Sequence, residues 1–161
     1  MRSVILALVV GGSSCAASGQ GLFLQSSCAA SQRSSLLEDD GYVAYLFLNA
    51  PGTQVPEKEV VVYSRRPPVR KNDWWALSKT GDKPLLSQDI ASADAVLAQP
   101  VEREFVFRWS KDCASVAVLH KGVPLAFLSA ADKTGYAKAV KRSSALGQPW
   151  NQRLYDAAFA K

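Results

Sequence analysis

Three titratable side chains in the second half of the chain have the chemistry that hydrolysis needs. Glu102 and Glu104 stand two residues apart, so on an extended strand both carboxylates would share a face. Paired carboxylates can cleave glycosides, and the chain's only histidine, His120, could activate a serine nucleophile. Arg103 and Arg108 flank the glutamates, however, whereas a general acid needs an apolar setting that raises its pKa. These residues therefore define only an alternative function, a small hydrolase.

A second kind of chemistry, the recognition of anions, is concentrated in residues 65–75, which read RRPPVRKNDWW. Arginine presents forked donors to carboxylate or phosphate, and tryptophan offers a large contact area with one polar N–H. Both residue types are frequent hot spots of binding interfaces, and loops often carry binding function. We predict a mostly exposed binding loop, whose candidate residues are Arg65, Arg66, Arg70, Lys71, Trp74 and Trp75.

The distribution of charge favours an anionic partner. The chain has a formal net charge of +5, and residues 61–161 carry 16 basic and nine acidic side chains. Such an excess is typical of proteins that meet acidic proteins, lipid headgroups or cell-wall polymers. Metal sites need clustered His, Cys, Asp or Glu, so one histidine and dispersed cysteines predict no metal, and we expect no cofactor. The acidic run at 38–40 is interpreted as a solvated turn.

The N-terminus has the pattern of an export signal. Arg2 supplies a positive charge, residues 4–10 are purely apolar, residues 11–14 are small, and Cys15 follows. This order is typical of a bacterial secretory signal, and the position of the cysteine predicts a lipoprotein with its lipid on Cys15. Two alternatives stay open: a cut after Ser18 would give ordinary secretion, and the segment could remain uncleaved. The apolar run is too short to span a bilayer.

Export also bears on the two remaining cysteines. Outside the cytosol two thiols tend to pair, so we expect Cys28 and Cys113 to form a disulfide. The alternative is that Cys28 lies in a disordered linker and Cys113 is a lone thiol. Because Ser- and Gly-rich sequence continues to about residue 35, the expected organisation is a signal peptide at 1–14, a flexible tether at 15–35 and a single globular domain at 36–161.

Strands are predicted where aromatic and β-branched residues cluster. Residues 42–48 (YVAYLFL) and 59–63 (EVVVY) are apolar on both faces and are expected to pair in the centre of a sheet. Residues 102–109, 114–120 and 123–128 have the spacing of a three-stranded antiparallel meander.

Helical spacing predicts a central helix at 88–98 and two C-terminal helices, at 132–146 and after Pro149. The 132–146 helix would present a basic face, a second candidate for anion binding, made of Lys138, Lys141 and Arg142. Strands followed by helices, without β-α-β alternation, indicate an α+β fold. The expected architecture is an antiparallel sheet of about five strands, two C-terminal helices and one shorter central helix.

These patterns together predict a non-enzymatic binding protein of the bacterial cell envelope, on the periplasmic side and held to the membrane by its lipid. Its partner would be a protein or another anionic envelope component, for example an acidic toxin that this chain neutralises as an inhibitor or immunity protein. Nucleic acid is not expected as a partner of an exported chain. The alternatives are an envelope hydrolase that uses Glu102, Glu104 or His120, and a soluble periplasmic or secreted location. The sequence does not indicate an oligomeric state.

Overall fold

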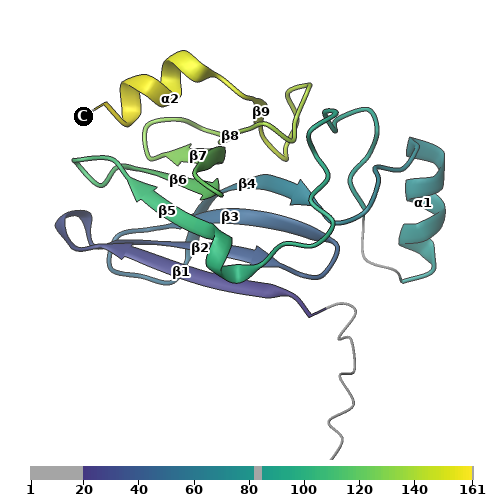
Figure 1. The fold of residues 1–161 in the computed structure, drawn as a ribbon, viewed down its shortest axis with the longest axis horizontal. Coiled ribbons are helices and arrows are strands. Elements are labelled where there is room, and N and C mark those ends of the chain that lie inside the picture. Colours follow the sequence, from purple (N-terminus) through teal and green to yellow (C-terminus); the bar gives the residue numbers. More distant parts are fainter. Residues whose placement is uncertain (1–19, 82–84, 161) are drawn as a thin grey trace, which may run out of the picture.

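The chain folds into two sheets that pack face to face, as seen in the computed structural model, which describes residues 20–81 and 85–160. The first sheet is antiparallel with the order β1-β2-β3-β4 (Figure 1), and its strands are β1 (Leu22–Cys28), β2 (Arg33–Asp39), β3 (Val43–Asn49) and β4 (Pro56–Ser64). The second has the order β5-β6-β7-β8-β9, and its strands are β5 (Phe105–Trp109), β6 (Ser115–His120), β7 (Val123–Ser129), β8 (Tyr136–Ala137) and β9 (Gln148–Pro149). Its strands are antiparallel except for the parallel pair β8–β9.

Two α-helices and two short 3-10 turns complete the described elements, namely α1 (Lys71–Lys79), α2 (Gln152–Ala158), η1 (Ala29–Ser31) and η2 (Glu102–Glu104). None of the described helices is long and apolar enough to cross a membrane. The α+β class is therefore confirmed, although there are two sheets instead of one and a single C-terminal helix instead of two.

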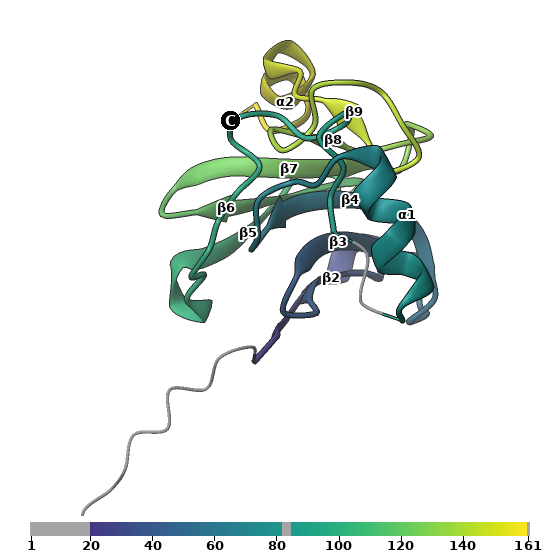
Figure 2. The same cartoon turned by 90° about the vertical axis from the view of Figure 1, so that its right-hand side faces the viewer.

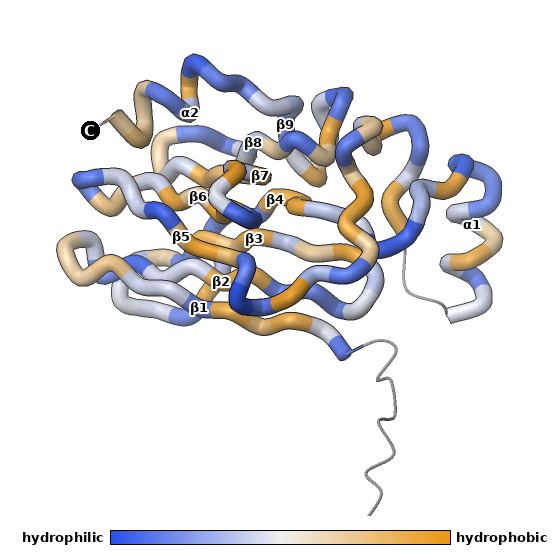
Figure 3. Tube along the Cα trace, viewed as in Figure 1, coloured by the Kyte–Doolittle hydropathy of each residue, from blue (hydrophilic) through white to orange (hydrophobic). Residues whose placement is uncertain are grey.

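The main core lies between the two sheets, where β3 and β4 pack against β7. Side chains alternate between the two faces of a strand, so every second residue points inward. Leu37, Leu46 and Val60 face inward from the first sheet, and Val118 and Leu128 from the second, and all five are fully buried. Hydrophobic residues accordingly concentrate along the strands, whereas many turns are hydrophilic (Figure 3).

The outer face of the second sheet is covered by α2 (Figures 1 and 2). Phe127 of β7 meets Tyr155 and Phe159 edge-on, with ring centroids 5.7 and 6.0 Å apart. Arg108 of β5 holds the end of the helix, because its Nη2 donates a hydrogen bond to the Phe159 carbonyl oxygen at 2.8 Å. The helix begins at the N-cap Asn151, whose side chain accepts a hydrogen bond from the Leu154 N–H. The helix predicted after Pro149 is thus confirmed.

The strands predicted from apolar clusters are confirmed as β3 to β7, with two differences. β4 pairs with β3 as expected, but it forms the edge of its sheet and not its centre. Residues 102–104 form the 3-10 turn η2 and not the start of a strand. Glu102 and Glu104 therefore do not share a strand face.

The expected tether is wrong over the described strands β1 and β2, which start at Leu22 and Arg33. Although this segment is rich in serine, its Leu22 and Leu24 pack against the main core, and its exposed and half-buried residues alternate. The part of the tether at residues 15–19, like the signal peptide and Cys15, lies outside the described residues.

The disulfide between Cys28 and Cys113 is confirmed, with the two Cα atoms 5.8 Å apart. It joins the end of β1 to the turn between β5 and β6, so it links the two sheets along one side. A hydrogen bond reinforces this link, because the Trp109 indole Nε1 donates to the Ser26 hydroxyl at 2.9 Å.

The helices expected at 88–98 and 132–146 are both wrong, because these segments form bridges to each other. Ala91 pairs with Val140 in an antiparallel bridge, and the Ser92 N–H donates to the Ala139 carbonyl oxygen. Small apolar residues of both segments, such as Ala91 and Ala139, pack in the core and do not form the face of a helix. At Gly135 the backbone passes so close to β4 that a Cβ would lie 2.7 Å from the Val60 Cβ.

Candidate functional site

The basic–aromatic segment at 65–75 is divided between an extended stretch and a helix. Residues 71–73, expected in the loop, begin helix α1, with Arg70 as its extended N-cap residue. Arg70 lies close to the helix, because its Nε is 3.1 Å from the Asp73 carboxylate. No residue of α1 is buried, so the helix stands at the edge of the molecule beside the ends of the strands (Figure 1).

Arg65 does not belong to an exposed binding loop. Its Nε lies 2.8 Å from the Asp39 Oδ2, and only 14% of its side chain is exposed. The Tyr63 hydroxyl donates to the same oxygen at 2.6 Å, and the Gly41 N–H donates to the other oxygen. Burial, followed by the hydrogen bond to Asp39, raises the pKa of Tyr63. Arg65 thus neutralises a buried carboxylate, and the expected solvated turn at 38–40 is wrong at Asp39.

The other predicted cations are exposed. The Arg66 guanidinium lies over the Tyr42 ring at 5.3 Å, and Arg70 and Lys71 reach the surface of the helix start. Trp75 is 55% exposed and Trp74 is half-buried, with the two rings edge to face at a centroid distance of 4.9 Å. The expectation that a tryptophan leaves part of its ring at the surface therefore agrees with the structure.

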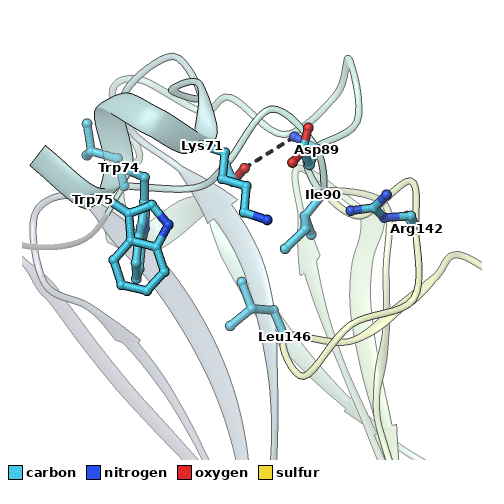
Figure 4. Close-up of a pocket in the computed structure, with 9 residues that line it drawn as sticks. Lys71, Trp74, Trp75, Asp89, Ile90, Arg142 and Leu146 are labelled. Carbon is cyan, nitrogen blue, oxygen red and sulfur yellow. Dashed lines mark hydrogen bonds between the residues drawn. The ribbon is translucent and has the colours of Figure 1, made fainter. Parts of the chain in front are cut away.

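A cleft of about 370 Å³ lies beside the two tryptophans. It is bordered by three segments, the last of which is far from the other two in the sequence. Its lining is Lys71, Trp74, Trp75, Leu85, Ser87, Asp89, Ile90, Arg142 and Leu146. Figure 4 shows Lys71 and Arg142 approaching the space above Ile90 and Leu146 from opposite sides, with the tryptophans forming one wall. Most of the lining surface is apolar, with two cations and one carboxylate at the rim.

Backbone hydrogen bonds fix the segments that form the cleft. Val69, just before α1, forms a parallel bridge with Ser87. The Lys141 N–H donates to the Ile90 carbonyl oxygen at 2.8 Å, and the Val61 N–H donates to the Leu146 carbonyl oxygen at 3.0 Å. Hydrogen bonds to the edge of β4 and between these segments therefore hold Ile90 and Leu146, which form the apolar floor of the cleft, in place.

The second predicted basic surface is only partly present. Since residues 132–146 are not a helix, Lys138, Lys141 and Arg142 do not form one helical face. The Lys138 ammonium lies over the Trp150 ring at 5.1 Å, whereas Arg142 lines the cleft opposite Lys71. The structure therefore brings one cation from each sequence candidate to the same place.

Sequence reasoning missed the apolar residues of the cleft. Ile90 and Leu146 fall within the predicted helices at 88–98 and 132–146, which the structure does not contain. Their apolar character was visible in the sequence, but their approach to α1 depends on bridges between distant segments. No local spacing could have indicated this contact.

Two of the three candidate residues of the alternative hydrolase, Glu104 and His120, are hydrogen-bonded to each other. His120 Nε2 donates to the Glu104 Oε2 at 2.8 Å, and the Lys121 ammonium is 3.4 Å from the other carboxylate oxygen. The hydrogen bond from His120 is the main cause that lowers the pKa of Glu104. This is the opposite of the shift that a general acid needs. Glu102 is exposed on η2, beside Val101 and Arg103.

The described residues do not suggest a metal ligand set, because within 20–81 and 85–160 no three His, Cys, Asp or Glu side chains gather where they could hold an ion. Comparison of the chain with protein-family models, with curated proteins and with solved structures found no match.

Proposed function

We propose that the chain is a binding protein of the bacterial cell envelope that engages an anionic partner through the cleft between α1 and the 142–146 segment. The observation that carries this proposal is the convergence of Lys71, Trp74 and Trp75 with Arg142 around one apolar floor. Two basic segments separated by about seventy residues of sequence meet there.

The chemistry of the lining suits binding more than reaction. The nine lining residues include neither histidine nor cysteine, and their only carboxylate is Asp89. The apolar wall would take an apolar side chain of the partner, while Lys71 and Arg142 would pair with a carboxylate or phosphate next to it. Asp89 would repel a second negative charge and so would favour partners with one anionic group per apolar anchor.

A protein partner fits this site better than a small molecule does. The cleft is open at the surface, and Trp75 projects beside it with more than half of its side chain in contact with water. Partly exposed tryptophan beside arginine is typical of the centre of protein interfaces. An inhibitor or immunity protein that neutralises an acidic envelope toxin is one function of this kind.

The cellular location is part of the proposal. The disulfide between Cys28 and Cys113 is compatible with an oxidising compartment outside the cytosol. Together with the signal-like sequence at 1–14, it supports export, with the lipid anchor on Cys15 as the proposed attachment.

Affinity capture from envelope extract tests the proposal. The mature domain is immobilised, and retained proteins are identified by mass spectrometry at low salt. The cleft variant carries Lys71→Ala and Arg142→Ala, and the matched control carries Lys79→Ala and Lys141→Ala. Lys79 lies on the same helix and Lys141 next to Arg142, both are exposed, and neither lines the cleft.

We expect the wild type and the control to retain the same acidic partner and the cleft variant to lose it. Raised salt should weaken retention by the wild type. If no partner is retained at low salt, or if the cleft variant melts normally and retains the same proteins, the proposal is wrong.

A further inference from the structure

The outer faces of the two sheets differ in whether a helix covers them. Helix α2 covers the outer face of the second sheet and buries Phe127 there. Neither described helix covers the outer face of the first sheet, since α2 lies on the other sheet and α1 lies beyond the strand ends (Figures 1 and 2).

The pairing register defines the residues on this outer face. One row across β1 to β3 consists of Phe23, Glu38 and Tyr45, and it ends at Val61 of β4, which is fully buried. The next row consists of Gln25, Leu36, Phe47 and Glu59. We call these two rows the outer surface. Residues that alternate with them, such as Leu37 and Leu46, point into the core.

Large apolar side chains on the outer surface are in contact with water. Phe23 is 68% exposed, and Leu36, Tyr45 and Phe47 are only half-buried. The Tyr45 and Phe47 rings have centroids 6.3 Å apart, so they form one aromatic patch. Contiguous exposed aromatic residues on a sheet are typical of interaction sites.

The charge of the outer surface is opposite to the charge of the whole chain. Neither row contains a basic residue, and the two exposed glutamates, Glu38 and Glu59, flank the aromatic patch. Burial is the first cause that raises the pKa of Tyr45, and the nearby carboxylates of Asp40 and Glu59 raise it further. Negative charge therefore lies close to the Tyr45 hydroxyl. A basic chain therefore carries one acidic and aromatic face.

We propose that the outer surface docks a cationic protein segment, with Phe23, Tyr45 and Phe47 as apolar contacts and Glu38 and Glu59 as charge partners. Charge complementarity selects this occupant, because an anionic or uncharged partner would leave the two carboxylates unpaired or repelled. This surface is separate from the cleft, so the chain would offer two surfaces that select partners of opposite charge.

A short blocked peptide in which lysine and leucine alternate serves as the probe, since it presents cations on one side and apolar groups on the other when extended. Backbone amide shifts of the labelled domain locate the binding site, and a titration gives the dissociation constant. The test variant is Glu38→Gln with Glu59→Gln. The control variant, Asp94→Asn with Glu102→Gln, removes the same charge from exposed positions elsewhere.

We expect shifts confined to β1–β4 and a dissociation constant that rises about tenfold in the test variant, equal to about 1.4 kcal/mol for two charge pairs. Phe47→Ala should weaken binding as well, whereas the control variant and the cleft variant should bind the peptide as the wild type does. The matching glutamate–leucine peptide should not bind. Melting curves establish that each variant is folded.

Three results would overturn this inference. The peptide could shift residues around Asp89 in place of the sheet, or the test and control variants could weaken it equally, which would indicate general attraction to net charge. Sedimentation could also show a dimer that Glu38→Gln with Glu59→Gln dissolves, in which case a second copy of this chain occupies the face. The second result leaves the proposal about the cleft untouched, because that site is probed by different variants, whereas the first would also count against the selection of anionic partners by the cleft.

Discussion

Arg65 shows how a residue type that suggests binding can have a structural role. The sequence places it in a run of cations, but the fold puts its guanidinium against the fully buried Asp39 carboxylate. Its neighbour Arg66 remains exposed. The difference depends on strand register, because β2 and β4 bring Asp39, Tyr63 and Arg65 together from distant parts of the sequence.

Replacing Arg65 should therefore destabilise the domain. In Arg65→Ala the Asp39 carboxylate keeps its bonds from Tyr63 and Gly41 but loses its charge partner. Breaking a buried pair by removing one partner typically costs about 3–5 kcal/mol. Urea unfolding at neutral pH measures this free energy. Arg66→Ala is the control and should cost about 1 kcal/mol or less, since it removes only a cation–π contact with Tyr42. Equal costs for both would contradict this account of Arg65.

The Glu104–His120 pair predicts a change that is visible in a titration. The hydrogen bond from His120 is the largest cause of the lowered pKa of Glu104, with Lys121 contributing less. In His120→Ala, the pKa of Glu104 should rise toward its ordinary value, and in Lys121→Ala it should rise by a smaller amount. Carbon-detected NMR of the Glu104 carboxyl measures both.

The sign of the linked stability follows from the lowered pKa. The contact stabilises the fold at pH values above the ordinary glutamate pKa, and this contribution disappears as the pH falls through the lowered pKa of the folded state. As the pH falls through this range, the free energy of unfolding should therefore decrease less in His120→Ala than in the wild type. An unchanged Glu104 titration would show that His120 does not act on the carboxylate.

At the scale of elements, strands were more predictable than helices for a physical reason. Strands β3 and β4 carry compact clusters of β-branched and aromatic residues, a signal that is local. Strand β1 and only the first three residues of β2 fall within the predicted tether, a segment that is rich in serine. Their stability comes from pairing with β3, from Leu24 in the core and from the disulfide, and none of these is visible in a short window of sequence.

The two false helices had apolar residues at helical spacing, yet those residues enter the core from bridged loops. A spacing of three or four residues is weak evidence where small residues such as Ala91 and Ala139 allow close backbone approach. For the same reason, the cations of the cleft could be predicted from the sequence, whereas its apolar floor, Ile90 and Leu146, could not.

The disulfide should contribute substantially to stability because it joins the two sheets. It closes a sequence separation of 85 residues between β1 and the β5–β6 turn. Cys28→Ser with Cys113→Ser should lower the free energy of unfolding by about 2–5 kcal/mol. Denaturant unfolding with and without reductant measures the loss, and reduction of the wild type should reproduce the variant. If the variant and the wild type unfold at the same denaturant concentration, the bridge does not stabilise the fold.

At the scale of the whole molecule, the chain joins its two sheets by a disulfide and carries a cleft lined by cations as well as an acidic, aromatic sheet face. The fold class and the disulfide followed from the sequence because composition and cysteine count are global properties. The position of the acidic outer surface did not, since Phe23 and Glu38 join the face of Tyr45 and Phe47 only through sheet register.

The proposed lipid anchor on Cys15 predicts a change in cell fractionation. In Cys15→Ser the acceptor of the lipid is absent, so the chain should leave the membrane fraction or remain unprocessed. Intact-mass analysis of the wild type should show loss of residues 1–14 and an added lipid mass. If the variant and the wild type have the same mass and fractionate identically, the chain is not a lipoprotein.

The most direct test of the central claim is the dissociation constant of the captured acidic partner, measured by calorimetry for three forms of the domain. Lys71→Ala with Arg142→Ala should raise this constant at least about tenfold, because both cations face the cleft, and should leave the melting temperature nearly unchanged. Lys79→Ala with Lys141→Ala removes the same charge and should leave the constant within about twofold of the wild type. An equal rise in both variants, or no rise in the cleft variant, would contradict the claim that this cleft is the binding site.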